Sequence, residues 1–186
     1  MKRLIVTGDD FGLALPVNEA IEEAHRKGIL TTASLMVGAT AVEDAVSRAT
    51  RCPSLKVGLH LVLVEGRPIM RPQAVPDLVD RRGEFSSHLV RAGFKFFFRP
   101  AVRRQLALEI RAQFEAFQKT GLPLDHVNGH NHMHLHPTIL GLILKIGQDF
   151  GLKAIRCRMS LPGWRGKHRG RGSPESWPPR WSLGHG

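Results

Sequence analysis

The chain contains the stretch Val57-Gly58-Leu59-His60-Leu61-Val62-Leu63-Val64, an apolar run interrupted by one histidine. A short apolar run bounded by polar and turn-forming residues is typical of a buried strand. We therefore predict a strand at residues 56–64. The segment that follows, residues 65–85, is rich in Pro, Gly, Arg and Asp and predicts a long loop. A loop of this length inside a compact domain is often functional.

Strand and helix signals alternate along the chain on both sides of this run. We predict further strands at residues 4–7, 30–37, 124–128 and 153–156. We predict helices at residues 16–27, 39–50, 102–117 and 137–150, where apolar residues recur every three or four positions. This alternation indicates an α/β protein in which helices cover a parallel sheet. The sheet is expected to be either doubly wound or part of a (β/α) barrel.

The last thirty residues differ in character from the rest. Residues 157–186 have no periodicity, are dense in Arg, Gly and Pro, and contain all three tryptophans of the chain. We interpret them as a disordered tail and residues 1–156 as the folded unit. Because a strand at 153–156 should be followed by a helix and none is indicated, we hypothesise that the reading frame changes near Cys157.

Composition limits the class of protein. With 186 residues and 42% hydrophobic residues, the chain fits one globular domain. No run approaches the roughly 18 apolar residues of a membrane-spanning helix, and the short apolar N-terminus ends in two aspartates rather than forming a signal peptide. We therefore expect a cytoplasmic protein without a transmembrane segment.

The formal charge of +11 raises the question of an anionic partner. One basic cluster is interleaved with phenylalanines: Arg91, Phe94, Lys95, Phe96, Phe97, Phe98, Arg99, Arg103 and Arg104. It is suited to peripheral contact with a membrane surface, or its phenylalanines are core residues and its arginines a solvated rim. The basic tail has no element that reads bases, so we expect no specific nucleic-acid binding.

Four residues that can bind a metal ion or transfer a proton lie within or just after the predicted strands. Asp9 and Asp10 follow the first strand, His60 belongs to the third, and His130 follows the strand at 124–128. Because the carboxyl ends of parallel strands share one edge of the sheet, we expect these side chains to meet there. Two imidazoles and a carboxylate form a common open site for a divalent metal ion. The second carboxylate can then accept a proton from an attacking water. Successive side chains of an extended segment point apart, so we expect one aspartate to bind the metal and the other to face the substrate.

Other interpretations of these residues remain open. An Asp-Asp pair after a strand also fits a helix cap or turn, and His60 alone fits a core histidine. The spacing also suits an iron site with two histidines and a carboxylate. Half of the ten histidines lie in one tract, which could be a surface feature with incidental metal affinity. These are His126, His130, His132, His134 and His136.

Three segments resemble, in order and spacing, the YdjC-like family of carbohydrate deacetylases, also called the ChbG/HpnK family. They are Thr7-Gly8-Asp9-Asp10-Phe11-Gly12, Val57-Gly58-Leu59-His60-Leu61 and His126-Val127-Asn128-Gly129-His130-Asn131-His132-Met133-His134. The resemblance covers residues 1–156. Residues 33–37, 97–106 and 122–128 look most like the HpnK branch, which is associated with hopanoid biosynthesis.

The resemblance implies a distorted, TIM-like (β/α) barrel of the glycoside hydrolase/deacetylase type, incomplete in this chain. It implies removal of an acetyl group from an N-acetylated sugar or glycolipid, with Mg²⁺ or Zn²⁺ as cofactor. The family's metal ligands correspond to Asp10, His60 and His130, and its general base corresponds to Asp9. Four more residues are expected around the ligands or the substrate: Phe11, Asn128, His132 and His134.

The chain departs from the family pattern at two places. The family commonly has Asp at the position of Asn128, which cannot ionise but can still orient a ligand histidine by hydrogen bonding. The family also continues to a His-Pro-Gly motif whose histidine is expected to protonate the leaving amine, whereas His185 of this chain lies in Leu-Gly-His-Gly. A barrel without its last strands has open edges, which a second copy could cover in a homodimer. The alternatives to an active deacetylase are therefore a catalytically inactive, truncated remnant and a basic protein that binds lipid or nucleic acid.

Overall fold

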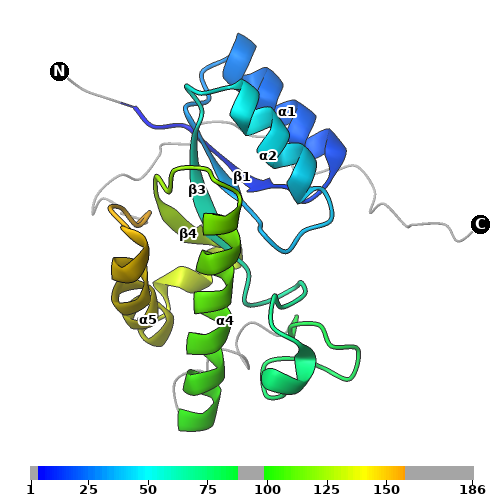
Figure 1. Ribbon diagram of the computed structural model, residues 1–186, viewed down its shortest axis with the longest axis vertical. Coiled ribbons are helices and arrows are strands. Elements are labelled where there is room, and N and C mark those ends of the chain that lie inside the picture. The colour runs from blue at the N-terminus through cyan, green and yellow to red at the C-terminus, as the bar shows by residue number, and fades with distance from the viewer. Residues whose placement is uncertain (1–3, 88–98, 158–186) are drawn as a thin grey trace, which may run out of the picture.

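The computed structural model describes residues 4–87 and 99–157 of the chain. Strands and helices alternate along these residues (Figure 1). Their order is β1 (Thr7–Phe11), α1 (Leu15–Lys27), β2 (Thr32–Leu35), α2 (Val42–Arg51), β3 (Lys56–Leu61), η1 (Pro72–Ala74), α4 (Pro100–Lys119), β4 (Val127–Gly129), η2 (His130–Leu135), α5 (Pro137–Gly147) and η3 (Gln148–Phe150). The prediction of an α/β protein is confirmed.

The four strands form one parallel sheet in the order β1-β2-β3-β4. Each strand pairs with the next one along the chain, and Ile155 forms a further parallel bridge to Val127 of β4. A doubly wound sheet would reverse its strand order at a switch point, whereas a barrel adds each strand beside the last. The order therefore indicates a sector of a (β/α) barrel.

The two faces of the sheet differ in chemistry. In the register of the sheet, Leu35 of β2, Leu59 of β3 and Val127 of β4 are neighbours on one face. They belong to a core shared with helix residues such as Phe114 and Ile139. Because side chains alternate along a strand, the opposite face carries Ser34, His60 and Asn128, all buried and polar. The apolar face holds the helices, and the polar face is available for a site.

Buried polar side chains attach the loops to this framework at the carboxyl end of the sheet. Asn18 of α1 accepts a hydrogen bond from the backbone N–H of Gly12 (2.7 Å) and donates to the carbonyl of Ala41 (2.9 Å). It therefore joins the turn after β1 to the start of α2.

The long loop after β3 is attached to α4 in the same way. Gln113 pairs with both the N–H (3.0 Å) and the carbonyl (2.7 Å) of Val62. The carboxylate of Glu109 accepts hydrogen bonds from the backbone N–H groups of Ile69 (2.9 Å) and Met70 (3.0 Å). Burial raises the pKa of the Glu109 carboxyl, although these hydrogen bonds oppose the shift. Residues 65–85 form a loop, as predicted, apart from the short helix η1 and an isolated bridge between Val79 and Phe85. Glu109 fixes the loop near its start.

Several predicted boundaries are wrong. Residues 4–7 were expected to form a buried strand, but β1 begins at Thr7, where pairing with β2 starts, and Leu4 is 75% exposed. Strand β3 ends at Leu61 rather than at residue 64, and residues 153–156 form only the isolated bridge at Ile155. The predicted helix at 137–150 is divided into α5 and η3.

Two features of the sequence lie outside the described residues. They are the phenylalanine cluster at 94–98 and nearly all of the predicted tail, residues 158–186. Within residues 4–87 and 99–157, no helix combines the length and apolarity needed to cross a bilayer.

Replacing Gly58 by alanine is expected to destabilise the fold. An added Cβ would lie 2.5 Å from the carbonyl oxygen of His126 and 2.6 Å from its ring, so β3 and β4 would have to separate. Overpacking of this kind typically costs about 1–3 kcal/mol, measurable by urea denaturation. The matched control is Gly141→Ala in α5, where no atom lies within 4 Å. That change should stabilise the helix by about 0.5–1 kcal/mol. Equal stability of Gly58→Ala and the wild type would contradict the close approach.

Candidate metal centre

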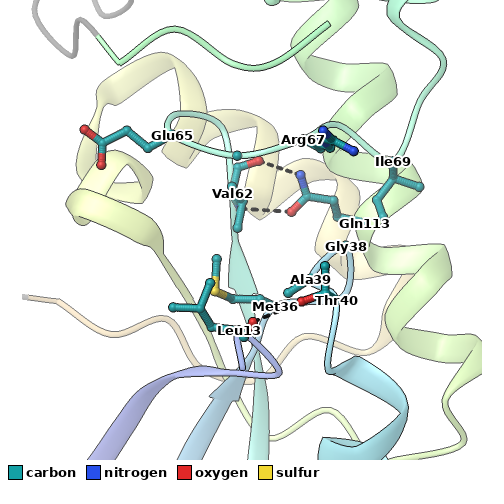
Figure 2. Close-up of a pocket in the computed structure, with 11 residues that line it drawn as sticks. Leu13, Met36, Gly38, Ala39, Thr40, Val62, Glu65, Arg67, Ile69 and Gln113 are labelled. Carbon is teal, nitrogen blue, oxygen red and sulfur yellow. Dashed lines mark hydrogen bonds between the residues drawn. The ribbon is translucent and has the colours of Figure 1, made fainter. Parts of the chain in front are cut away.

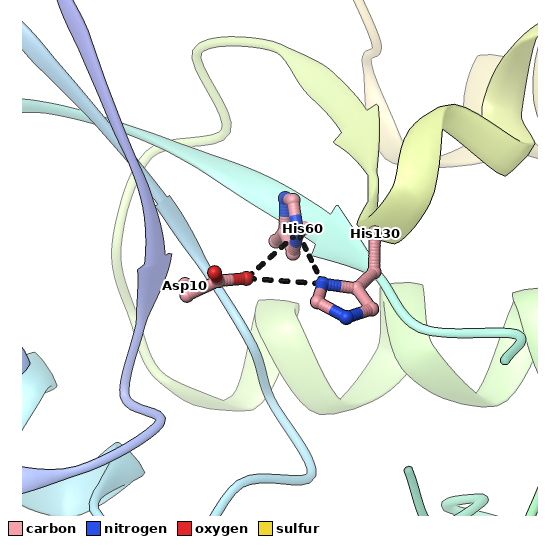
Figure 3. Close-up of side chains that lie close together, drawn as sticks. All are labelled: Asp10, His60 and His130. Atoms are coloured by element: carbon pink, nitrogen blue, oxygen red, sulfur yellow. Dashed lines mark hydrogen bonds and ion pairs between the residues drawn. The ribbon is translucent and has the colours of Figure 1, made fainter. Parts of the chain in front are cut away.

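Three side chains from separate segments converge at the carboxyl edge of the sheet (Figure 3). Asp10 comes from β1, His60 from β3, and His130 directly follows β4. Oδ1 of Asp10 lies 3.2 Å from Nε2 of His60 and 3.1 Å from Nδ1 of His130, and these two nitrogens lie 3.4 Å apart. One oxygen and two imidazole nitrogens facing a common point are the donor set of an open divalent metal site. The donor atoms and spacing of Asp10, His60 and His130 therefore suit the binding of one metal ion.

A backbone irregularity brings both aspartates to the polar face of the sheet. The pairing of β1 with β2 shifts register between Gly8 and Phe11, and Asp10 has a left-handed φ of 60°. In a regular strand the two side chains would point to opposite faces, as we expected from the sequence. The bulge instead directs Asp10 to His60 and His130, and Asp9 to Asn128 on the same face. The expectation that the two side chains point apart is wrong.

Asp9 is held by two donors. The guanidinium of Arg156 binds it through both oxygens, with Nη1–Oδ1 and Nη2–Oδ2 distances of 2.9 Å and 2.7 Å. Nδ2 of Asn128 donates to Oδ1 at 2.9 Å. Burial alone would raise the pKa of Asp9, but these hydrogen bonds and the nearby positive charges outweigh burial and lower it. Asp9 is therefore ionised at neutral pH and can accept a proton.

The charges of Asp10 and His130 support one another. Hydrogen bonds from His130 and His60 hold the pKa of Asp10 well below its usual range. The same contact with Asp10 raises the pKa of His130, although partial burial opposes the shift.

Asn128 lies between His60 and Asp9. Its Oδ1 accepts a hydrogen bond from Nδ1 of His60 at 2.7 Å, and its Nδ2 also donates to Oγ of Ser34 at 2.9 Å. The structure thus places the neutral amide against His60, one of the three candidate metal ligands.

Three other predicted site residues, His134, His132 and Phe11, lie outside the group of converging donors. Nε2 of His134, which is 2% exposed, donates to the carbonyl oxygen of Arg156 at 2.8 Å, and burial lowers the pKa of His134. His134 therefore supports the arginine that binds Asp9. His132 is exposed, and its ring lies 6.2 Å from that of His134. Phe11 is fully buried in the hydrophobic core.

Sequence reasoning missed three residues of the site. Arg156 ends the predicted strand at 153–156, and a charged residue at a strand end could have revealed it. Ser34 is a polar residue within a buried strand, the same signal that drew attention to His60. Glu65 gave no signal, since it lies in a polar loop. Its carboxylate accepts a hydrogen bond from Asn131 (2.8 Å) and lies 3.8 Å from Nε2 of His130.

A cavity of about 160 Å³ lies beyond the carboxyl ends of β1, β2 and β3 (Figure 2). Its walls are mainly apolar and include Leu13, Met36, Val62 and Ile69. The amide of Gln113 also lines it but is engaged by Val62. Leu13 follows Asp10 by three residues and Val62 follows His60 by two, so the cavity adjoins the metal centre along the chain.

The structure combines a barrel-like parallel α/β sheet with a candidate metal centre of one aspartate and two histidines at its carboxyl edge, and a second carboxylate lies beside that centre. Comparison with known proteins identifies the family. A sequence profile of the YdjC-like protein family matches residues 3–181. The chain therefore belongs to the YdjC-like family.

Individual proteins similar in sequence to this chain are carbohydrate deacetylases. A carbohydrate deacetylase of Brevibacillus brevis is 42% identical over 151 residues, 80% of this chain and 56% of that protein. A carbohydrate deacetylase of Oceanobacillus iheyensis is 38% identical over 148 residues, 80% of this chain and 62% of that protein. The chain thus spans about three fifths of the length of these curated relatives.

A solved structure supports the fold. The crystal structure of an Enterococcus faecalis protein, named for a proposed cleavage of cellobiose phosphate, superposes with a TM-score of 0.72 at 30% identity. The match covers 82% of this chain and 58% of that one.

Metal binding is expected to weaken as the pH falls through the pKa of His130. This pKa is raised by Asp10, and the imidazolium must lose its proton before Nδ1 can bind a metal ion. Above the raised pKa the affinity should not depend on this proton, and below it the affinity should fall by about tenfold per pH unit. Titration calorimetry with Zn²⁺ in buffers of different ionisation enthalpy would measure both the affinity and the released proton. His25→Ala, which removes a histidine bonded to Ser54, is the control and should behave as the wild type. An affinity independent of pH between about 5.5 and about 8 would show that His130 is not a ligand.

Proposed function

We propose that the protein is a metal-dependent deacetylase that hydrolyses the acetamide of an N-acetylated sugar or glycolipid. The observation that carries this proposal is the pairing of an ionised carboxylate, Asp9, with the convergent donors of Asp10, His60 and His130. The names of the relatives, carbohydrate deacetylases, support a carbohydrate substrate.

Asp10, His60 and His130 would hold the metal ion. Such an ion would polarise the acetamide carbonyl and lower the pKa of a water molecule. Two of the three donors are imidazoles, which suit Zn²⁺, whereas Mg²⁺ prefers oxygen ligands. We therefore expect Zn²⁺ to bind more tightly than Mg²⁺.

Asp9 acts as the general base. It accepts a proton from the attacking water while the water oxygen bonds to the carbonyl carbon. Arg156 and Asn128 keep the carboxylate ionised and fix its orientation. When the C–N bond breaks, the amine nitrogen needs a proton, and Asp9 holds one to return. The products are acetate and a free amine.

The substrate is proposed to carry an apolar part. Leu13, Met36, Val62 and Ile69 form an apolar wall of the cavity, and Glu65 and Arg67 line it as well, so the cavity suits a substrate with both an apolar part and hydroxyl groups. The resemblance of residues 33–37 and 97–106 to the HpnK branch further supports a glycolipid linked to hopanoid biosynthesis.

Acetate release from N-acetylglucosamine-containing sugars and glycolipids tests the proposal. We expect release with added Zn²⁺ and none with a chelator. Asp9→Asn should lower kcat by about 10²–10⁴-fold, since general-base catalysis contributes that much, while calorimetry shows retained metal binding.

The matched control is Asp149→Asn, which removes an exposed carboxylate paired with Arg111 and should leave turnover unchanged. Full activity of Asp9→Asn would show that the base is misassigned. No release from folded, metal-loaded wild-type protein would favour the inactive alternative.

Replacing Arg156 by methionine should change the pH dependence of turnover. Arg156 lowers the pKa of Asp9, so its loss raises that pKa, and the base becomes protonated at higher pH. With the metal site kept saturated at every pH, so that protonation of His130 does not set the limb, the acidic limb of the pH profile of kcat/KM should therefore move to higher pH. Arg111→Met, which removes the exposed partner of Asp149, should leave the profile in place. An unmoved acidic limb in Arg156→Met would mean that Asp9 does not determine it.

A further inference from the structure

The cavity beyond the carboxyl ends of β1, β2 and β3 has the size and the walls of a subsite for a small apolar group. Its volume is about 160 Å³, and an apolar protein cavity of about 150 Å³ stays dry and binds benzene. The side chains of Met36 and Val62 are only 5% and 8% exposed, whereas those of Leu13 and Ile69 remain 45% and 37% exposed. The apolar lining therefore extends from the protein surface to the buried floor of the cavity.

Hydrogen bonds within the protein hold the walls of this cavity. Gln113 of α4 pairs with both backbone groups of Val62, at 3.0 Å and 2.7 Å. The hydroxyl of Thr40 donates to the carbonyl of Leu13 at 3.3 Å and so joins the loop after β2 to the turn after β1. The polar groups of Gln113 and Thr40 are therefore engaged by the protein itself. The cavity is formed before a ligand enters, as is usual for small-molecule sites.

Gly38 keeps the cavity open between the loops after β2 and β3. An added Cβ at this position would lie 3.1 Å from Cδ1 of Ile69 and 3.6 Å from the carbonyl oxygen of Arg67. The φ angle of Gly38 lies outside the left-handed range in which glycine is favoured. The backbone conformation therefore does not require glycine here, and what glycine provides is space.

The position of Glu65 indicates which part of a substrate reaches the cavity. Glu65 lines the cavity, and its Oε2 lies 3.8 Å from Nε2 of His130. In Figure 2 its side chain extends away from the other labelled residues, so Glu65 lies where the metal centre and the cavity meet. A carboxylate accepts hydrogen bonds from sugar hydroxyl groups, whereas an alkyl chain beside it would displace water without replacing its hydrogen bonds. A sugar ring therefore suits the position next to Glu65, and the group attached to that sugar suits the cavity.

We propose that the cavity is the subsite for an apolar aglycone of the N-acetylated sugar, about the size of a six-carbon ring, and that Gly38 determines this specificity. The proposal rests on the proposed function for the sugar and its acetamide, and it adds the size and the place of the group attached to the sugar. A free sugar would not fill the cavity, and a long lipid would place only the part nearest the sugar in it.

Calorimetry with the Zn²⁺-loaded full chain tests the subsite. The probes are the methyl and phenyl glycosides of glucosamine, which carry no acetyl group and are not turned over. We expect the phenyl glycoside to bind about 10–100-fold more tightly than the methyl glycoside, the gain from burying an apolar group of that size. Equal affinities, or no binding of the phenyl glycoside, would overturn the proposal, and this result needs no variant to fold.

Gly38→Leu tests the role of Gly38. The added side chain should fill the cavity, so the preference for the phenyl glycoside should fall to about onefold while the affinity for the methyl glycoside is retained. The matched control is Gly141→Leu in α5, where no atom lies within 4 Å of an added Cβ, and it should keep the wild-type preference. A preference that survives in Gly38→Leu would refute the assignment of Gly38.

Two further results separate this proposal from its neighbours. Tighter binding of hexanoate than of acetate, without a preference for the phenyl glycoside, would assign the cavity to the acyl group and contradict the proposal. A preference for the phenyl glycoside without any acetate release would leave the subsite in place and contradict the proposed function alone. Acetate release without that preference would do the reverse.

Discussion

The side-chain amide of Asn128 connects three other strands to β4. It accepts from His60 of β3 and donates to Asp9 of β1 and Ser34 of β2. One accepted and two donated hydrogen bonds require a group with both an acceptor and two donors. An ionised carboxylate at this position could still accept from His60, but it would repel Asp9 and offer nothing to donate. The asparagine therefore joins the carboxylate of Asp9 and the imidazole of His60 in one hydrogen-bonding network.

One face of the sheet packs against the helices and stabilises the fold, and the opposite face carries the polar side chains of the candidate site. Leu35, Leu59 and Val127 bury apolar area against the helices, which is the dominant favourable term in folding. The opposite face is polar and depends on complete hydrogen bonding, since an unmatched buried polar group costs about 1–3 kcal/mol. Positive φ angles occur at Asp10 within β1, at Glu65 in the loop after β3, and at Asn131 and His132 just after β4. Such conformations persist only where surrounding contacts enforce them.

The sequence predicts the parallel α/β fold well because strand and helix periodicities differ and alternate. It also predicts that Asp10, His60 and His130 lie at one edge, since parallel strands end together. It could not predict that Asp9 and Asp10 share a face, because the bulge arises from a register shift and a positive φ at a residue other than glycine. The apolar residues Leu4 and Ile5 resembled a strand, but pairing with β2 begins only at Thr7. The contact of Arg156 with Asp9 spans 147 positions, and no local pattern encodes it.

The distance along the chain between Asp9 and Arg156 has a consequence for how the protein is made. The aspartate is synthesised long before its guanidinium partner, which follows α5 in the chain. Until Arg156 is in place, Asp9 lacks the cation whose hydrogen bonds lower its pKa. The carbonyl of Arg156 is bonded to His134, so the segment after α5 and the turn after β4 must both be folded for this ion pair to form.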